Sequence, residues 1–192
     1  LNELRDILVD IRRDDQRASE VIRRLRSLLR KTPFEMKCID LNETGRQVIG
    51  FVTAMAQGRN IILRCVTTSV DLTVKGDAVQ LQQVVLNLIV NAVEAISEAD
   101  ANEREVSVIT NLSDDIVEIR ISDTGPGIAA GDLKSIFDPF FTTKPQGMGM
   151  GLAIVRTIVE AHQGQISAAN LSSGGALFAI RLPSAHGRSV SR

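Results

Sequence analysis

The 192-residue chain contains no tryptophan and no tyrosine, and aromatic residues make up only 3% of it. A platform that stacks single-stranded bases needs such rings. The net charge of −1 provides no overall field for nucleic acid or an anionic membrane. No apolar run reaches the length of about 20 residues that spans a bilayer, and no signal peptide opens the chain. We therefore expect no nucleic-acid partner, no membrane contact in this segment and a cytoplasmic location, with any membrane anchor in a preceding part of a longer parent protein.

Cysteine is also scarce. Cys38 and Cys65 do not form a CxxC pair and have no histidine at the spacing of metal ligands. Isolated cysteines in a reducing compartment usually behave as small buried hydrophobic residues. We expect two buried, free thiols.

Hydrophobic residues make up 44% of the chain, enough for a packed core. Residues 1–31 nevertheless stand apart, because their apolar positions recur in steps of three and four. This seven-residue pattern predicts a long bundle helix whose apolar stripe needs a partner helix. Its arginines alternate with acidic residues, which indicates a solvated face and not a DNA contact. Thr32-Pro33 ends the pattern, so residues 32–36 are predicted to be a linker.

The remainder alternates between strand and helix patterns, which predicts an α/β domain over residues 37–183 and a flexible tail over 184–192. Asn42 and Asp77 are the expected helix N-caps. An irregular, glycine-rich stretch is expected over 123–150. The predicted strands are 36–41, 60–67, 71–75, 105–112, 116–122, 165–170 and 176–182, and the predicted helices are 42–57, 77–97 and 151–162. The strands 105–112 and 116–122 are predicted to form a hairpin that turns at residues 113–115.

The predicted helix over 77–97 carries one narrow polar stripe on an otherwise apolar surface. Asn87 and Asn91 lie one turn apart within it, although asparagine is a poor helix former. The stripe is either an ordinary solvated face or a pair of amide oxygens for a hard cation such as Mg²⁺. Its members are Gln80, Gln83, Asn87, Asn91, Glu94 and Glu98.

Asp123 follows a predicted strand and precedes Gly125 and Gly127. The sequence Asp-Thr-Gly-Pro-Gly is either an ordinary turn or a site for a base. A carboxylate can accept a hydrogen bond from the exocyclic amine of adenine, whereas guanine presents an acceptor at that edge.

Gly147, Gly149 and Gly151 precede or open the predicted helix over 151–162. Backbone N–H groups at such a helix start can bind phosphate, although this is not a P-loop. Between the two glycine clusters, three phenylalanines fall in a segment predicted to be a loop. We expect Phe137, Phe140 and Phe141 to anchor a mobile lid, with Thr142, Thr143 and Lys144 available to phosphate.

In order and spacing, these four motifs resemble the N, first-glycine, phenylalanine and second-glycine boxes of histidine protein kinases. Residues 37–183 are similar to the catalytic, ATP-binding domain of a two-component sensor kinase. Residues 1–31 resemble the second helix of that family's dimerisation and phosphotransfer hairpin. The resemblance implies a Bergerat-type α/β fold, a two-layer sandwich of a mixed sheet and three helices, preceded by the long N-terminal bundle helix.

The resemblance also implies ATP and Mg²⁺ as ligands. It makes Asn91 the principal Mg²⁺ ligand with Asn87 assisting, gives Asp123 the adenine amine, and makes residues 128–148 the ATP lid. Asn87, Asn91 and Lys144 are then the catalytic residues. The implied nucleotide-binding set is Asn87, Asn91, Glu94, Asp123, Gly125, Gly127, Ile128, Thr142, Thr143, Lys144, Gly147, Met148, Gly149, Gly151 and Leu152.

Two departures from the family pattern stand out. Many such kinases have Lys or Arg where this chain has Glu94, whose charge would repel phosphate unless Mg²⁺ or Lys144 offsets it. Neither His162 nor His186 fits the phosphoacceptor position. We expect a protein-histidine kinase fragment whose acceptor histidine lies on a helix missing from this sequence. Its expected partners are that helix, a second kinase subunit in a homodimer and a response-regulator receiver domain with an acceptor aspartate.

ATP hydrolases of the same superfamily use a glutamate as general base four residues before the Mg²⁺-binding asparagine. Asn87 occupies that position here, so the resemblance favours phosphoryl transfer and slow hydrolysis. Two alternatives stay open. One is a regulatory module that binds ATP without transfer, and the other is a serine kinase of the anti-sigma-factor type.

Overall fold

The computed structural model describes residues 35–68, 70–99, 103–144 and 147–186. The chain divides into two units, residues 1–34 and 35–192. The described residues all belong to the second unit, so the predicted bundle helix over 1–31 lies outside them. The second unit is an α/β domain with three helices, α2 (Leu41–Gln57), α3 (Ala78–Glu98) and α4 (Gly151–Ala161).

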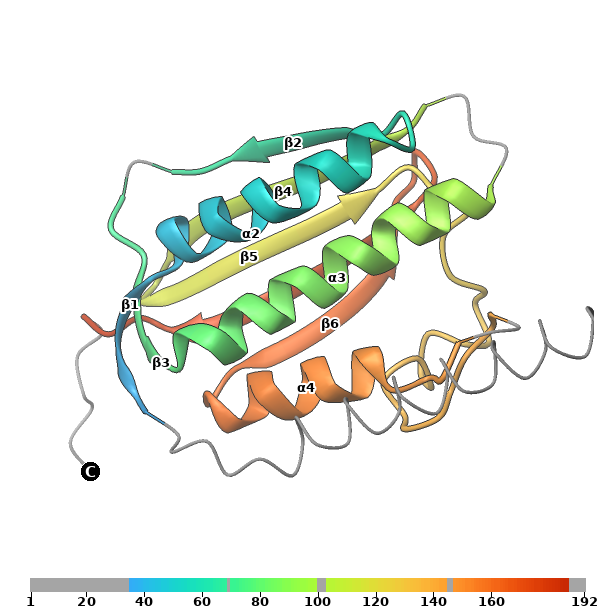
Figure 1. Ribbon diagram of the computed structural model, residues 1–192. Helices are drawn as coiled ribbons and strands as arrows, with labels where there is room; N and C mark the ends of the chain where they lie inside the picture. Colours follow the sequence, from blue (N-terminus) through green and yellow to red (C-terminus); the bar gives the residue numbers. More distant parts are fainter. Residues whose placement is uncertain (1–34, 69, 100–102, 145–146, 187–192) are drawn as a thin grey trace, which may run out of the picture. The chain divides into compact units, whose positions relative to one another are not determined.

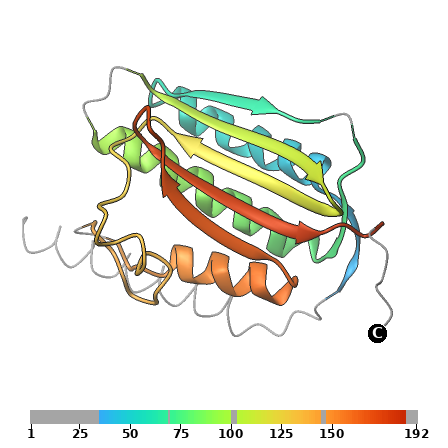
Figure 2. The ribbon, with the colours of Figure 1, turned by 180° about the vertical axis from the view of Figure 1, so that it is seen from behind.

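A mixed five-stranded sheet forms the second layer of this domain (Figure 1). Strands Ile62–Val66 and Glu105–Ser113 pair in parallel, and all other neighbouring strands of this sheet pair antiparallel. The helices cover one face, and in Figure 2 no described element covers the other face. The strand order is β2 (Ile62–Val66), β4 (Glu105–Ser113), β5 (Ile116–Asp123), β7 (Ala176–Pro183) and β6 (Gln165–Asn170), while β1 (Lys37–Asp40) and β3 (Thr73–Gly76) form a separate antiparallel pair.

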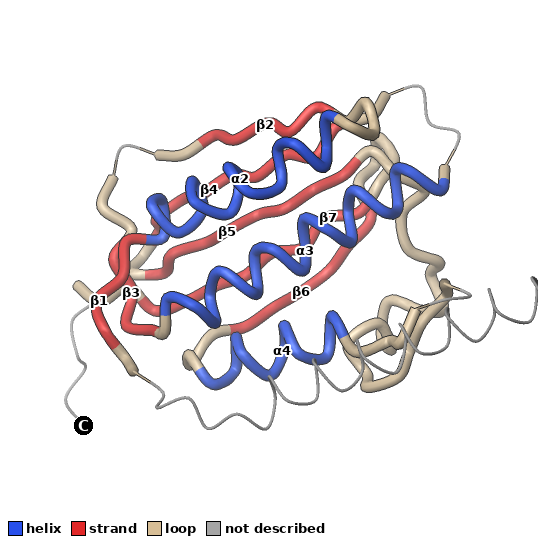
Figure 3. Tube along the Cα trace, viewed as in Figure 1, coloured by secondary structure: helices blue, strands red, loops and turns tan. Residues whose placement is uncertain are grey.

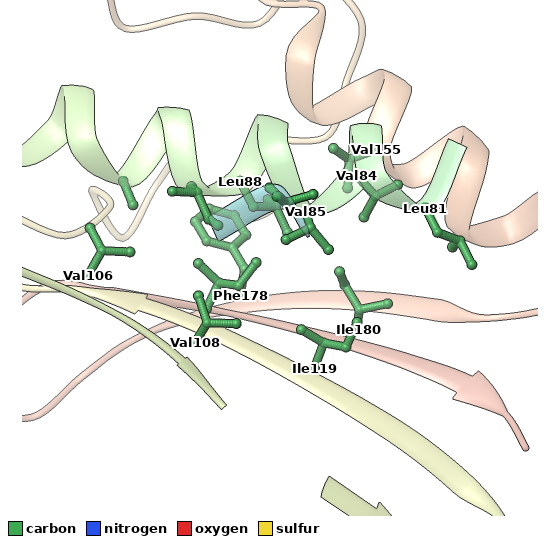
Figure 4. Close-up of a cluster of buried hydrophobic side chains, with 14 of the residues drawn as sticks. Leu81, Val84, Val85, Leu88, Val106, Val108, Ile119, Val155, Phe178 and Ile180 are labelled. Atoms are coloured by element: carbon green, nitrogen blue, oxygen red, sulfur yellow. The ribbon is translucent and has the colours of Figure 1, made fainter. Parts of the chain in front are cut away.

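The core lies between the helices and the inward side of the sheet (Figure 4). On β5, Val117, Ile119 and Ile121 alternate with more exposed residues and are buried, as the period of a strand requires. Among the described residues, α3 is the one helix long and apolar enough to cross a membrane by length and composition. Eight of its residues are buried in the domain, which is the pattern of a core helix.

The two N-cap predictions have different outcomes. Asp77 caps α3 as predicted, since its Oδ1 accepts hydrogen bonds from the N–H groups of Val79 and Gln80. The cap of α2 is Asp40 and not Asn42, because the Asp40 carboxylate accepts from Asn42 N at 2.8 Å. Asn42 lies in the first turn and is buried.

The predicted hairpin over 105–122 is confirmed. Asp114 and Asp115 form its turn with φ of 50° and 63°, the left-handed values that a two-residue type I′ turn uses. Asp115 O also accepts from Ser184 N at 2.8 Å, and Thr73 O accepts from Ala185 N at 2.8 Å. The start of the predicted flexible tail is therefore attached to the domain, while residues 187–192 lie outside the described part.

The prediction of buried cysteines is wrong. Cys38 and Cys65 are both free and both exposed. Cys38 lies on β1 of the small sheet, and Cys65 on β2, an edge strand of which four residues are exposed. A strand at the edge of a sheet buries less of its surface than a central strand. The residues around Cys65 in the sequence do not indicate that their strand lies at an edge.

His162 connects two helices. It is only 2% exposed at the end of α4, and its Nε2 accepts a hydrogen bond from Asp77 N at 2.9 Å. Its Nδ1 lies 2.7 Å from Ile158 O, so the ring donates there and the proton is assigned to Nδ1. This helix-terminal residue therefore ties the end of α4 to the beginning of α3.

Candidate functional site

The polar stripe of α3 contains the first group of predicted site residues. Asn87, Asn91 and Glu94 are partly buried. Among the described residues, neither asparagine side chain has a hydrogen-bond partner. Such amides inside a helix are available to a ligand. Their oxygens suit a hard cation such as Mg²⁺, which prefers oxygen ligands. In the described part of the chain, no group of three or more His, Cys, Asp or Glu side chains could hold a metal ion.

Asp123 ends β5, and the alternation of that strand turns its side chain toward the helices, where it is 4% exposed. Oδ1 accepts hydrogen bonds from Gly125 N at 2.9 Å and Ala176 N at 3.3 Å. No described residue donates to Oδ2. Burial raises the pKa of this carboxyl, and the two backbone hydrogen bonds oppose the shift only in part. The site thus presents one carboxylate oxygen without a donor among the described residues, on a side chain that is otherwise almost fully buried.

Two glycines allow close packing around this carboxylate. At Gly125, a Cβ would lie 2.9 Å from Asp123 Oδ1 and 3.4 Å from Ala95 Cβ, so the turn after β5 packs against α3. At Gly175, with φ of +88°, a Cβ would collide with the Asp123 carbonyl oxygen. The sequence predictions did not include Gly175 or Ala176. The Gly174-Gly175 pair between two predicted strands was the available signal.

Asp123→Asn is expected to stabilise the fold at neutral pH. The raised pKa means that this carboxyl contributes most stability below its unfolded pKa and loses that contribution as pH rises through the folded pKa. An asparagine keeps the Oδ1 acceptor without the buried charge. We expect Tm to rise by roughly 2–4 °C at pH 7, the shift that about 1 kcal/mol produces in a domain of this size, and the gain to shrink near pH 4.5.

Thermal unfolding followed by circular dichroism at both pH values measures this difference. Asp114→Asn is the matched control, since Asp114 is exposed in the turn at the other end of β5. If Asp123→Asn does not raise Tm at pH 7, or raises Tm more near pH 4.5 than at pH 7, the buried charge of Asp123 does not destabilise the fold.

Asn170 fixes the start of the predicted lid. Its Oδ1 accepts from Ile128 N at 2.8 Å and its Nδ2 donates to Ile128 O at 2.7 Å. Gly127, with φ of +77°, leaves room for this contact, because a Cβ there would lie 2.9 Å from Asn170 Oδ1. The sequence predictions named Gly127 and Ile128 but missed Asn170, which lies at the end of β6 and carries no local motif.

The segment between β5 and α4 has neither helix nor strand among its described residues, as predicted (Figure 3). Phe137 packs edge-on against Phe178, with ring centroids 6.4 Å apart, and Phe141 packs partly buried against the core. Phe140 is 74% exposed, so its predicted role as an anchor is wrong. Its backbone has φ of 68° and passes Gly149 so closely that a Cβ on that glycine would strike it.

Lys144 brings the lid segment (residues 128–148) to α3. Its Nζ donates to Glu94 Oε2 at 2.5 Å, and the two side chains are 28% and 40% exposed. Its backbone N donates to Thr142 Oγ1, and its carbonyl accepts from Gly147 N. In this structure, Lys144 is therefore the group that offsets the charge of Glu94. Thr143 is exposed and Met148 partly buried.

Gly151 and Leu152 open α4. The N-cap position belongs to Met150, which makes no side-chain capping hydrogen bond. The first N–H groups of a helix have no partner within the helix, so they are donors that an anion could use.

A cavity of about 410 Å³ lies next to Asp123. Three acidic residues, Glu103, Glu105 and Asp123, and no Lys or Arg line it. This charge disfavours a polyphosphate there, so the site on α3 is the better candidate. The lining residues are Glu103, Glu105, Ser107, Ser122, Asp123, Thr124, Leu171, Ser173 and Gly174.

The arrangement resembles known proteins. Residues 76–186, more than half of the chain, match the family model described as "Histidine kinase-, DNA gyrase B-, and HSP90-like ATPase". The chain belongs to this ATPase family. Within the family, its homologues are sensor histidine kinases, and it has the ATP-binding catalytic domain of such a kinase. The sensor histidine kinase TmoS of Ectopseudomonas mendocina is 38% identical over 183 residues, which are 94% of this chain but only 19% of TmoS.

Solved histidine kinase structures share the fold. The nucleotide-free catalytic domain of histidine kinase ThkA aligns with a TM-score of 0.70 and 32% identity, over 78% of this chain and 96% of that one. ThkA in complex with response regulator protein TrrA aligns with a TM-score of 0.74 and 27% identity, over 89% and 48%. Full-length ShkA in complex with AMPPNP gives 0.69 and 28%, over 78% and 31%. The predicted α/β histidine kinase domain is thus confirmed.

Proposed function

We propose that this chain binds ATP with Mg²⁺ and delivers the γ-phosphoryl group to a histidine that neither of its own two histidines supplies. An aspartate of a response regulator then receives the group. One observation carries the proposal: predicted motifs from three parts of the sequence converge on the second half of α3. Asn91 lies on that helix, Gly125 packs against Ala95, and Lys144 contacts Glu94.

The adenine is assigned to Asp123. Its side chain is largely buried and is fixed through Oδ1 by two backbone N–H groups, and no described residue donates to Oδ2. That oxygen can accept a hydrogen bond from the exocyclic amine of adenine. Guanine would place a carbonyl acceptor against the carboxylate, so the site selects ATP over GTP.

The phosphates are assigned to the other groups of the site. Asn91, with Asn87 one turn earlier, would hold Mg²⁺ through amide oxygens. The cation, when bound, supplies neutralisation of phosphate charge. Lys144 and the uncapped N–H groups of α4 supply the remaining positive charge. Phosphoryl transfer needs this combination of positioning and neutralisation more than it needs covalent chemistry.

Hydrolysis is expected to be slow because the site has no placed general base. Asn87 carries an amide, which cannot take a proton. The nearest carboxylate on the stripe is Glu94, and it is paired with Lys144. Water bound beside the phosphates would therefore find no acceptor for its proton.

The two histidines of the chain do not fit the acceptor role. His162 is buried and both of its ring nitrogens are engaged. His186 is exposed next to Asp71, following β7. We therefore place the acceptor on the dimerisation hairpin of the kinase, whose second helix residues 1–31 resemble, and place the activity in the cytoplasm. The solved complex of ThkA with its response regulator supports the last step.

The test is transfer in trans. The chain is mixed with a helical-hairpin domain that bears an acceptor histidine, and with ATP labelled on the γ-phosphate. We expect acid-labile, alkali-stable label on the hairpin, the signature of phosphohistidine. The same mixture with the acceptor histidine replaced by alanine is the control.

Other outcomes identify the alternatives. Acid-stable label on a protein substrate would indicate a serine kinase. ATP binding without label on any histidine-bearing hairpin would indicate a regulatory module. Either result overturns the proposed transfer.

A further inference from the structure

The contact between Glu94 and Lys144 joins α3 to the lid segment. Among the described residues, it is the one hydrogen bond or ion pair between that segment and α3. The neighbouring Thr142 and Thr143 are exposed. The place of the Lys144 ammonium therefore depends on this carboxylate.

Glu94 lies on the same side of α3 as the two amides. It follows Asn91 by three residues and Asn87 by seven, spacings that align side chains along one face of a helix. A lysine held by Glu94 is consequently held beside Asn91. The helix face that would hold the cation thus also fixes the position of an ammonium group that comes from the lid.

The partial burial of Glu94 and Lys144 strengthens the electrostatic attraction between them. Charges that are partly withdrawn from water are screened less than exposed pairs. A free lysine side chain has many rotamers, and ordering it at the moment of binding costs conformational free energy. An anchor that orders Lys144 before the nucleotide arrives removes that cost.

We propose that Glu94 is a positioning residue, which holds the Lys144 ammonium where it contacts the terminal phosphate of ATP. The inference rests on the proposed function. It accounts for a carboxylate at a place where phosphate repulsion would otherwise be expected: the negative charge acts through Lys144, whose three N–H donors can serve the carboxylate and a phosphate together.

This role predicts an effect of opposite sign in two backgrounds. In the wild-type chain, Glu94→Gln removes the anchor and weakens ATP binding. In a Lys144→Met background, Glu94 has no ammonium to hold and only repels phosphate, so the same Glu94→Gln change strengthens ATP binding. If the contact between Glu94 and Lys144 only stabilised the fold, Glu94→Gln would not change ATP affinity in opposite directions in the two backgrounds.

The experiment measures ATP and ADP affinities by calorimetry in Mg²⁺ for the wild type, both single variants and the double variant. We expect Glu94→Gln to lower ATP affinity about 3- to 10-fold in the wild-type background and to change ADP affinity less. In the Lys144→Met background we expect a gain of about 2- to 5-fold for ATP. Glu118→Gln is the matched control, because Glu118 pairs with Arg120 and Arg181 on the open face of the sheet.

The proposal is overturned if Glu94→Gln raises ATP affinity in both backgrounds, which would make the carboxylate a competitor of phosphate. It is equally overturned if the change lowers affinity by the same factor in both, or has no effect in either. All three results leave the proposed function standing, provided that the wild-type chain binds ATP. Absence of ATP binding by the wild type overturns both.

Discussion

Asn91→Ala is expected to abolish the Mg²⁺-dependent part of ATP binding. The Asn91 amide is partly buried on α3 and has no hydrogen-bond partner among the described residues, so its removal leaves no protein group unpaired. Alanine also has the higher helix propensity, worth roughly 0.5 kcal/mol, so the fold should be retained or slightly stabilised. A loss of function with an unchanged or raised Tm therefore identifies a ligand-binding residue.

The measurement compares ATP affinity with Mg²⁺ and with EDTA. For the wild type we expect a large gain from Mg²⁺, and for Asn91→Ala a decrease in Mg²⁺-ATP affinity of about 100-fold, or 2.8 kcal/mol, with little remaining dependence on the metal. Gln83→Ala is the control, because Gln83 belongs to the same stripe about 12 Å before Asn91 along the helix axis. If Asn91→Ala keeps the full Mg²⁺-dependent affinity for ATP, Mg²⁺ is not bound by Asn91 on α3.

Asp123→Asn is expected to weaken adenine nucleotides about 10- to 100-fold, although it stabilises the fold. The backbone N–H groups of Gly125 and Ala176 keep their acceptor in the Oδ1 of asparagine. The amide nitrogen then replaces Oδ2 and presents a donor to the donor amine of adenine. Loss of a charge-assisted hydrogen bond costs about 1.5–3 kcal/mol, which corresponds to this change in affinity.

Calorimetry with ATP and GTP separates base recognition from general damage. The ratio of ATP to GTP affinity should fall in Asp123→Asn, because guanine offers an acceptor to the new donor. Asp114→Asn should leave both affinities unchanged. If the wild type binds GTP as tightly as ATP, Asp123 does not select the base.

Most of the fold follows from local patterns in the sequence. The alternation over 105–122 predicts a hairpin, and the apolar circumference of residues 77–97 predicts a buried helix. Both are present in the structure as β4, β5 and α3. Asp77 was predictable as a cap because a carboxylate directly precedes a long apolar helix.

Predictions failed where partners distant in the sequence decide the outcome. Asp40 displaced Asn42 as the cap of α2, while Asn42 donates to the Thr68 and Val70 carbonyls. Cys65 is exposed because β2 is an edge strand. Phe140 is exposed, whereas Phe137 and Phe141 pack against the core, and of these three residues Phe140 alone has a positive φ. The contacts of the Asn42 side chain and the edge position of β2 join residues that lie far apart in the sequence.

Local patterns in the sequence establish which chemical groups this protein possesses, their order, and most of the helices and strands that carry them, because periodicity and capping are local. The packing of the domain establishes which of these groups meet. It brings the turn after Asp123 against Ala95 and Lys144 against Glu94, and it places Asn170 on Ile128. Those contacts join segments separated by tens of residues, and they depend on how the sheet packs beneath α3 and not on any motif.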